Sequence, residues 1–383
     1  MRSKFFRSIA VAGLLALAGC SENAGSDLVA QAGELVNPEI SSDSEGGELP
    51  PNGGTDIFSS DDSTLPGESS PSGGEQFTDE SSSSSEENSE QGGFSSDNGQ
   101  QSSSSESVEG QTYAYGWAKG NPPVPTRGCG KQWNRVKSGS YEFQWSGGKR
   151  TIRIDIPDNY DNTKPYRLVF GMQCAGGWAG GVQQEGYYGL KPLDTEKTTI
   201  FVAPEGNGNW IPWAEADFKL FDELLADLQG NLCIDSSRVF STGFSYGSMF
   251  SNSLAWYHQD VLRAIAAYET AERNIWLPNP RTYKGIGWMG VLGFDDTRCT
   301  PEMGRAARDS ILISNSVNGQ ALYEQAEEAA PGGAHKCYDY KTVEDRFPVR
   351  WCTQSGGHIW DHKDPYQSES WVPEATWEFI TQF

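Results

Sequence analysis

The only G-x-S-x-G pattern in the chain is Gly243-Phe244-Ser245-Tyr246-Gly247. A serine hydroxyl is a weak nucleophile until a neighbouring base accepts its proton and an acid orients that base. In serine hydrolases this pattern lies on a sharp turn between a strand and a helix. Arg238–Ser241 has the composition of a strand and Met249–Tyr257 that of a helix. We therefore predict that Ser245 is a nucleophile on such a turn, the alternative being one more serine in a serine-rich chain.

The candidate bases are few, because the chain has only four histidines. In hydrolases of this kind the order along the chain is serine, acid, histidine. His258 comes directly after the helix that follows Ser245, so we interpret it as a helix-end residue. His358 follows a predicted strand and two glycines, which places it in a loop at the sheet edge where the serine is expected. We predict His358 as the base; His335 and His362 are the alternatives, and are otherwise solvated loop residues.

The acid is expected at the end of the strand that precedes His358. Gly287–Leu292 is a predicted strand, and Asp295 and Asp296 follow it closely. We predict Asp296 as the acid and Asp295 as a solvated turn residue, with the reverse assignment as the alternative. A carboxylate buried against His358 fixes the tautomer of the imidazole and stabilises the imidazolium that forms during attack.

The negative charge that develops on the substrate oxygen requires backbone N–H donors. One donor comes from the residue after the nucleophile, here Tyr246. The other comes from a loop after an early strand, and Phe170–Gly177 (FGMQCAGG) ends a strand in a glycine-rich loop. We assign the second donor to Cys174. The alternative is that this loop is an ordinary turn.

These residues require a sheet whose strands end at a common edge. Short apolar runs alternate with helix-like stretches in 111–383, a pattern typical of a mostly parallel sheet with helices on both faces. The absence of a G-x-G-x-x-G turn disfavours a dinucleotide-binding fold. The predicted helices are Asp217–Leu228, Tyr246–Tyr257 and Pro373–Phe383, and the predicted strands are Thr151–Ile156, Tyr166–Met172, Thr198–Ala203, Arg238–Thr242, Arg263–Ala267, Gly287–Leu292 and Phe347–Cys352.

Residues 1–20 have a basic start, an apolar run and small residues before Cys20. This is the layout of a secretory signal peptide, and it is too short to span a bilayer. Leu17-Ala18-Gly19-Cys20 resembles the lipobox of bacterial lipoproteins. We therefore predict export, lipidation of Cys20 and anchoring to the outer membrane or cell surface. The alternative is an ordinary cleaved signal and an extracellular protein.

Residues 21–110 contain 20 acidic and no basic residues, and are rich in Ser and Gly. Such a segment has too little apolar surface to offset the entropy of ordering it, so we predict a disordered linker. Most of the formal net charge of −23 lies there, and the chain has no basic patch of the kind that binds nucleic acid. We therefore predict three parts: the signal peptide 1–20, the linker 21–110 and one hydrolase domain, 111–383.

The six cysteines after Cys20 form an even set in a chain that is predicted to be exported. We expect disulfides among them, with buried thiols as the alternative. No C-x-x-C spacing occurs, and we expect no metal site. The set is Cys129, Cys174, Cys233, Cys299, Cys337 and Cys352.

Several motifs accompany GFSYG, in the same order, over nearly all of 129–383. Together they resemble the motifs of secreted feruloyl esterases, which belong to the carbohydrate esterase group that also contains acetyl xylan esterases and is related to polyhydroxybutyrate depolymerases. The motifs are YRLVFGMQCAGG at 166–177, YYGL at 187–190, FVAPEG at 201–206, LCID at 232–235, RVF at 238–240, RAIAA at 263–267 and GGH at 356–358.

The resemblance implies an α/β-hydrolase fold, no metal or organic cofactor, and release of ferulic or p-coumaric acid from esterified arabinoxylan in plant cell walls. It assigns Ser245 as nucleophile, Asp296 as acid and His358 as base. The partner is then the feruloylated polysaccharide, and we expect a monomer. The alternatives are an acetyl xylan esterase or polyester depolymerase with the same three residues, and a non-catalytic surface lipoprotein that binds polysaccharide.

The chain departs from the family pattern at four places. Gln173 stands where the oxyanion loop usually has a histidine, Leu292 where a histidine often precedes the glycine of the acid loop, and Ser248 where GFSYG is commonly followed by glycine. A late Asn-Gly-Cys is also missing, because Asn318-Gly319 is followed by Gln320.

Four tryptophans are candidate platforms for a phenolic ring or a sugar, because an aromatic face packs well against both. A role in the core is the alternative for each. They are Trp178, Trp210, Trp213 and Trp360.

Overall fold

The structure is a computed structural model that describes residues 117–134, 137–272 and 275–383. The predicted signal peptide, Cys20 and the predicted linker 21–110 lie outside the described residues. Within the described ranges, no helix is both long enough and apolar enough to cross a membrane.

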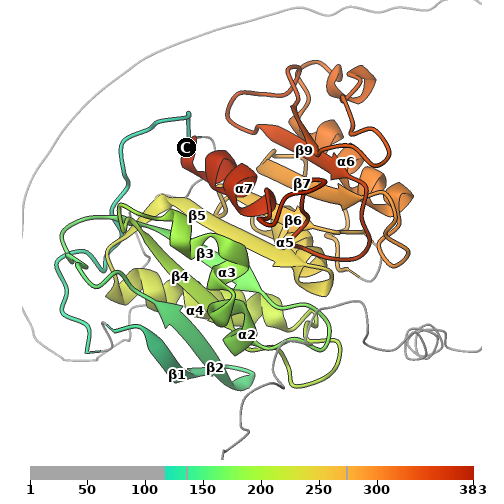
Figure 1. The fold of residues 1–383 in the computed structure, drawn as a ribbon. Helices are drawn as coiled ribbons and strands as arrows, with labels where there is room; N and C mark the ends of the chain where they lie inside the picture. The colour runs from blue at the N-terminus through green and yellow to red at the C-terminus, as the bar shows by residue number, and fades with distance from the viewer. Residues whose placement is uncertain (1–116, 135–136, 273–274) are drawn as a thin grey trace, which may run out of the picture. The chain divides into compact units, whose positions relative to one another are not determined.

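One sheet organises the described part of the chain, with strand order β1-β2-β4-β3-β5-β6-β7-β9-β8 (Figure 1). The six strands from β4 to β9 in this order pair in parallel, whereas β1 with β2, β2 with β4 and β8 with β9 pair antiparallel. The strands are β1 Gly139–Trp145, β2 Gly148–Asp155, β3 Tyr166–Met172, β4 Thr199–Pro204, β5 Ile234–Phe244, β6 Ala264–Tyr268, β7 Gly287–Gly293, β8 Lys336–Asp339 and β9 Val349–Gln354.

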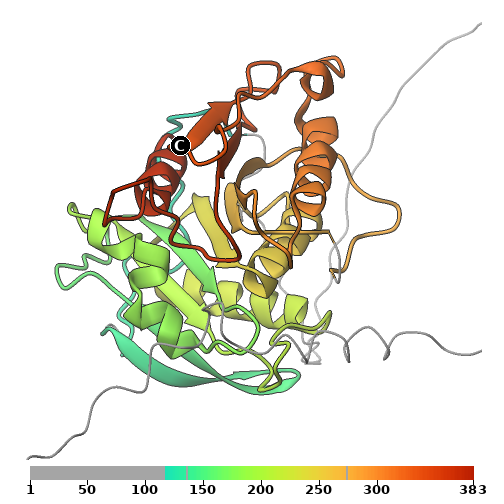
Figure 2. The same ribbon diagram turned by 45° about the vertical axis from the view of Figure 1, so that its right-hand side comes forward.

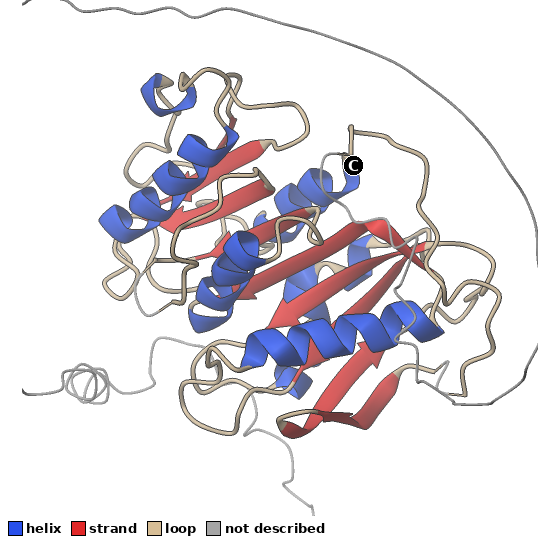
Figure 3. Ribbon diagram, turned by 180° about the vertical axis from the view of Figure 1, so that it is seen from behind, coloured by secondary structure: helices blue, strands red, loops and turns tan. Residues whose placement is uncertain are grey.

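Helices cover both faces of this sheet. Figure 2 shows the red α7 on the side that carries the green α2 and α3, with the orange α6 on the other side. Figure 3, seen from behind, shows the face with α4, α5 and α6. The helices are α2 Ala179–Gln184, α3 Gly186–Gly189, α4 Asp217–Asn231, α5 Tyr246–Tyr257, α6 Pro301–Asn315 and α7 Val372–Thr381, with 3-10 turns at Lys191–Leu193 and Ala321–Tyr323.

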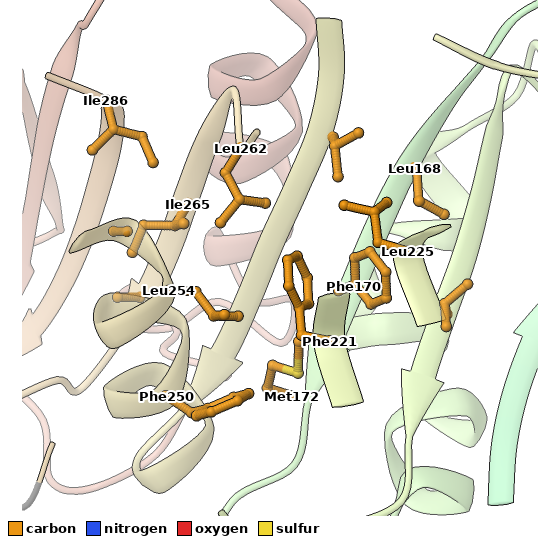
Figure 4. Close-up of a cluster of buried hydrophobic side chains, with 14 of the residues drawn as sticks. Leu168, Phe170, Met172, Phe221, Leu225, Phe250, Leu254, Leu262, Ile265 and Ile286 are labelled. Carbon is orange, nitrogen blue, oxygen red and sulfur yellow. The ribbon is translucent and has the colours of Figure 1, made fainter. Parts of the chain in front are cut away.

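Alternation along β3 explains why both faces are covered. Successive side chains of a strand point to opposite faces. Leu168, Phe170 and Met172 pack into the apolar cluster beneath α4, α5 and α6 (Figure 4). Val169 belongs to the cluster beneath α2, α3 and α7. With the parallel strand order, this two-faced core is the α/β-hydrolase fold, as predicted.

Helix α4 shows how the sequence specifies these layers. Phe218, Phe221, Leu224, Leu225 and Leu228 recur at helical spacing, and all are buried. Burying an aliphatic or aromatic side chain of this size stabilises the fold by roughly 1.5–3 kcal/mol. The Phe221 ring meets the Phe170 ring of β3 at 5.0 Å, so the predicted apolar face of α4 is the face that contacts the sheet.

Two disulfides join described residues, which confirms that the cysteines form disulfides. Cys129–Cys233 ties the segment before the sheet to the start of β5, across 104 residues of sequence. Cys337–Cys352 links directly paired residues of β8 and β9. The second bridge holds the edge strand against the strand that leads to the loop of His358. Cys299 is buried and takes part in neither bridge.

Candidate active site

Ser245 lies between the end of β5 and the start of α5, as the G-x-S-x-G pattern predicts. Its backbone has φ 54° and ψ −120°, a conformation that costs on the order of 1–3 kcal/mol for a residue with a side chain. Hydrogen bonds hold it there. The Ser245 N–H donates to the carbonyl of Tyr268 at 3.1 Å, and the Ser245 carbonyl accepts from the N–H of Met249 at 2.9 Å. Such a strained turn projects the side chain out of the sheet edge.

Gly243 and Gly247 make this turn possible because no side chain fits at either position. A Cβ on Gly243 would lie 2.4 Å from the carbonyl carbon of Gly247. A Cβ on Gly247 would lie 2.0 Å from the carbonyl oxygen of Met172, at the end of β3. The elbow therefore packs directly on the backbone that begins the glycine-rich loop.

Ser245, His358 and Asp296 form one continuous hydrogen-bonded chain. Ser245 Oγ lies 2.8 Å from His358 Nε2, and His358 Nδ1 lies 2.7 Å from Asp296 Oδ2. An ionised carboxylate only accepts hydrogen bonds, so the tautomer with the proton on Nδ1 satisfies both contacts and leaves Nε2 to accept from the serine hydroxyl. All three residues are buried, and the Phe244 ring packs 4.7 Å from the imidazole. The arrangement can remove a proton from Ser245.

Asp296 is held as a carboxylate by the groups around it. Burial opposes its ionisation, but the hydrogen bond and charge of His358, together with hydrogen bonds from Glu269 and the Arg298 N–H, outweigh burial, so the pKa of Asp296 lies below its ordinary value. Its other oxygen, Oδ1, accepts from the N–H groups of Arg298 at 2.7 Å and Cys299 at 3.0 Å. The neighbouring Asp295 is exposed. The structure thus places Asp296, and not Asp295, against the imidazole.

The remaining histidines lie away from Ser245. His258 caps the end of α5 and contacts Asp222 at 2.7 Å, which matches a helix-end residue. His335 contacts Asp364 at 2.9 Å at a partly exposed position. The prediction that His362, if it is not the base, is a solvated loop residue is wrong. Its side chain is 1% exposed.

The partner of His362 is Glu269, which the sequence analysis did not identify. Glu269 directly follows β6, and its side chain is fully buried, with Oε1 against His362 Nε2. An acidic residue at the carboxyl end of a buried parallel strand was the available signal, since the carboxyl ends of such strands form the usual site edge. The structure therefore brings a second histidine–carboxylate pair to the edge that carries the first.

The two predicted oxyanion donors lie on segments that touch. Tyr246 is the first residue of α5, and helix N-termini favour negative charge. Cys174 is in the loop after β3, and the backbone of this loop packs on Gly247. A Cβ on Gly247 would lie 2.8 Å from the carbonyl oxygen of Gln173. That carbonyl accepts a hydrogen bond from Trp213 Nε1 at 2.9 Å. The loop is therefore braced beside the start of α5.

Two departures from the family pattern have structural roles. The Gln173 amide donates from Nε2 to the Gly177 carbonyl at 2.9 Å, and its Oε1 accepts from the Gly206 N–H at 3.2 Å. It thereby cross-links the glycine-rich loop. Ser248 Oγ donates to the Ser245 carbonyl at 2.6 Å and lies 3.3 Å from the Glu269 carbonyl. Ser248 therefore ties the nucleophile turn to the end of β6.

The four candidate tryptophans separate by exposure. Trp213 is buried, and its ring stacks on Phe250 at 4.6 Å, so it belongs to the core. Trp360 is partly buried and meets the Tyr188 ring edge to face. Trp178 is 36% and Trp210 49% exposed. These two are the most exposed of the four.

The candidate metal ligands at this edge of the sheet are engaged in hydrogen bonds with other protein groups. Within the described residues, Asp296, Cys299 and His358 have ligand atoms within 4.8 Å of one another, but the Asp296 and His358 atoms are hydrogen-bonded to each other. His358 and His362 have H-x-x-x-H spacing, yet their Nε2 atoms contact different partners, Ser245 and Glu269. The donor set is better satisfied by protons than by a cation.

Comparisons with known proteins show which family the chain belongs to. No protein-family model matches the chain. Feruloyl esterase D of Neurospora crassa is 31% identical over 275 residues, which cover 68% of this chain and 91% of that protein. A probable feruloyl esterase C of Aspergillus flavus is 28% identical over 259 residues, covering 66% and 90%.

Among solved structures, the chain is similar to a ferulic acid esterase from Anaeromyces mucronatus, with 13% identity, coverage of 68% of this chain and 95% of that one, and a TM-score of 0.43. The sequence relatives are the more informative, because the match to the Neurospora protein spans about nine-tenths of its length. The chain belongs to the feruloyl esterase family, a family of carboxylic ester hydrolases.

Proposed function

We propose that this protein is a serine esterase that releases ferulic or p-coumaric acid from esterified arabinoxylan in plant cell walls. The observation that carries the proposal is the chain of contacts Ser245 Oγ to His358 Nε2 and His358 Nδ1 to Asp296 Oδ2. The names of the relatives support the choice of ferulate esters as substrates.

The proposed reaction has two balanced halves. Ser245 Oγ attacks the ester carbonyl carbon while His358 Nε2 takes the hydroxyl proton, and the N–H groups of Tyr246 and Cys174 hold the oxyanion. The C–O bond to the sugar then breaks, and the imidazolium returns the proton to the departing alkoxide. Water repeats the sequence on the acyl-enzyme and releases the carboxylic acid, which restores Ser245.

The alternatives are an acetyl xylan esterase and a polyester depolymerase with the same three residues. A survey of substrates separates them: kcat/KM of the purified full chain on methyl ferulate, on feruloylated arabinoxylan, on p-nitrophenyl acetate and on a hydroxybutyrate oligomer. The proposal expects the ferulate esters to be preferred. Cleavage of the acetate ester without release of ferulic acid would agree with the proposed mechanism and contradict the proposed ferulate substrate. No hydrolysis of any ester would favour a non-catalytic polysaccharide-binding protein.

The amino-terminal prediction becomes a second part of the proposal, namely that lipidation at Cys20 tethers the enzyme to a membrane and the segment 21–110 links it to the hydrolase domain. The layout of residues 1–20 supports it. Labelling expressing cells with radioactive palmitate tests it. The label should enter the wild-type protein and be absent from Cys20→Ser.

A further inference from the structure

The described residues contain a second buried histidine–carboxylate pair, which the proposed mechanism does not use. The side chains of Glu269 and His362 are 0% and 1% exposed and contact each other through Oε1 and Nε2. Glu269 comes from the end of β6, and His362 from the loop after β9 that also carries His358. Burying such a pair is costly unless each atom is satisfied, so its position at the site edge requires a reason.

The surroundings of Glu269 are fixed on the backbone side. Its N–H donates to the Val291 carbonyl at 3.0 Å, and its φ of 48° lies in the left-handed region, which is uncommon for a residue with a side chain. Oε1 accepts from the Gly293 N–H at 2.8 Å as well as contacting His362. The carboxyl is thus held between β6, the end of β7 and the loop after β9.

His362 is equally constrained. A Cβ on Gly293 would lie 2.9 Å from its ring, and a Cβ on Gly356 would lie 2.7 Å from Nδ1. The plane of the Trp371 ring lies at 19° to the imidazole, with centroids 6.3 Å apart. This close packing holds the imidazole of His362 with Nε2 toward Glu269.

The second oxygen of Glu269 is the informative atom. Oε2 is buried and accepts no hydrogen bond from an N–H or O–H group of the described residues, although a buried polar atom without a partner costs about 1–3 kcal/mol. The side chain that interacts with this carboxyl is that of Asp296, itself a carboxyl, so a hydrogen bond between the two requires a proton on one of them. The titratable groups that influence this pair are Asp296, from the loop after β7, and His358. Asp296 accepts three hydrogen bonds, and a carboxylate has about four acceptor positions. One position therefore remains for a donor on Oε2.

The electrostatic setting favours such a donor. Burial, followed by the charge of Asp296 and the interaction between the two carboxyls, raises the pKa of Glu269 well above its ordinary value. Burial lowers the pKa of His362 to about 4. Two adjacent carboxyls share a proton more readily than they both ionise. Both shifts favour a neutral acid beside a neutral imidazole.

The geometry points to Glu269 as a positioning residue: a neutral carboxylic acid whose Oε2–H donates to Asp296, while Oε1 accepts from Gly293 and His362. This inference rests on the proposed triad. The extra hydrogen bond orients Asp296 toward His358 and keeps it ionised, which in turn fixes the imidazole. His362 fixes the carboxyl in the orientation that the donation needs.

Two substitutions at one position test the inference in the full chain, with methyl ferulate as substrate. Glu269→Gln keeps an acceptor at Oε1 and places N–H donors at the Oε2 position, so it should leave kcat within about 3-fold of wild type and the pH profile of kcat/KM unmoved. Glu269→Leu has similar volume and no donor. It should lower kcat about 10- to 100-fold with little change in KM, and should move the acid limb of the profile to higher pH, because Asp296 without the donor holds the His358 proton more tightly.

Other outcomes would overturn it. Damage by Glu269→Gln equal to that of Glu269→Leu would mean that Glu269 acts as a carboxylate. A Glu269→Leu enzyme with wild-type kcat and pH profile but a lower Tm would mean a structural role alone. Ser245→Ala, assayed in parallel, keeps the two proposals separate: its full activity would reject the triad, whatever the Glu269 variants do. If Glu269→Leu does not fold, Glu269→Met, whose unbranched side chain also has no N–H or O–H donor, gives the same test.

Discussion

Ser245 Oγ and His358 Nε2 lie 2.8 Å apart although 113 residues separate them in the chain. Their strands are not neighbours in the sheet, because β6 and β7 lie between β5 and β9. The loop after β9 therefore reaches back across the ends of two strands. Asp296, from the loop after β7, contacts His358 of this loop. The site depends on parallel strands that end at one edge.

Loss of the imidazole should remove almost all activity. We expect His358→Ala to lower kcat about 10,000-fold or more, because among the described residues His358 is the base that Ser245 Oγ contacts. His335→Ala is the matched control and should stay within about 3-fold of wild type, since His335 contacts Asp364 and the Trp371 ring, and neither belongs to the chain from Ser245 to Asp296. Steady-state kinetics on methyl ferulate measure both. Equal losses in the two variants would argue against the assignment.

The two adjacent aspartates provide a second paired test. Asp296→Asn should lower kcat by about 10,000-fold, since an amide no longer selects the productive tautomer of His358. Asp295→Asn changes an exposed residue, so kcat should change less than about 2-fold. Circular dichroism spectra establish that both variants are folded. The reverse ranking would move the acid to Asp295.

We expect that adding even one methyl group at Gly247 disturbs the structure. A Cβ there would lie 2.0 Å from the Met172 carbonyl oxygen, so Gly247→Ala must displace the nucleophile turn or the loop after β3. We expect a loss of about 1–3 kcal/mol in the free energy of unfolding and at least a 10-fold loss in kcat. Gly181→Ala, in α2, meets only ordinary contacts at 3.4 Å and should be neutral or slightly stabilising. Urea unfolding compares them; equal stabilities would contradict the close packing.

The proton on Glu269 should make stability fall with rising pH. Its folded pKa is raised above the ordinary 4.5 by burial and by Asp296, so its contribution is fully present below about pH 4.5 and is lost as pH rises toward the folded pKa. Glu269→Gln cannot ionise. The difference in unfolding free energy between Glu269→Gln and wild type should therefore grow by about 1.4 kcal/mol per pH unit between about pH 5 and the folded pKa of Glu269, and level off above it.

Urea unfolding of both proteins between pH 5 and 8 measures this difference. His362, with a pKa of about 4, remains neutral in both folded proteins over that range, so its own contribution largely cancels. A difference independent of pH would show that Glu269 is already ionised in the folded protein.

The regular parts of the fold were predictable because burial on both faces leaves a strong pattern. The predicted Tyr166–Met172 and Tyr246–Tyr257 coincide with β3 and α5. The edge strands β1 and β8 were missed, since their side chains are partly exposed and the runs are less apolar. Helix α6 was missed too, because its polar outer face and the glycine in its first turn weaken the helical pattern.

The site was partly predictable for a similar reason. A turn motif fixes Ser245 locally, and chain order then selects Asp296 and His358 from few candidates. Glu269 and His362 could not be paired this way, because their contact depends on how the loop after β9 crosses the end of β6. No local sequence pattern indicates how this loop crosses β6. The burial of His362 follows from tertiary packing alone.

The central claim is that Ser245 carries out ester hydrolysis, and the most direct measurement is the release of ferulic acid from methyl ferulate by the wild-type chain and by Ser245→Ala. We expect release by the wild type and a rate at least about 10,000-fold lower for the variant, with an unchanged Tm. Equal rates of ferulic acid release from the two proteins would contradict the account.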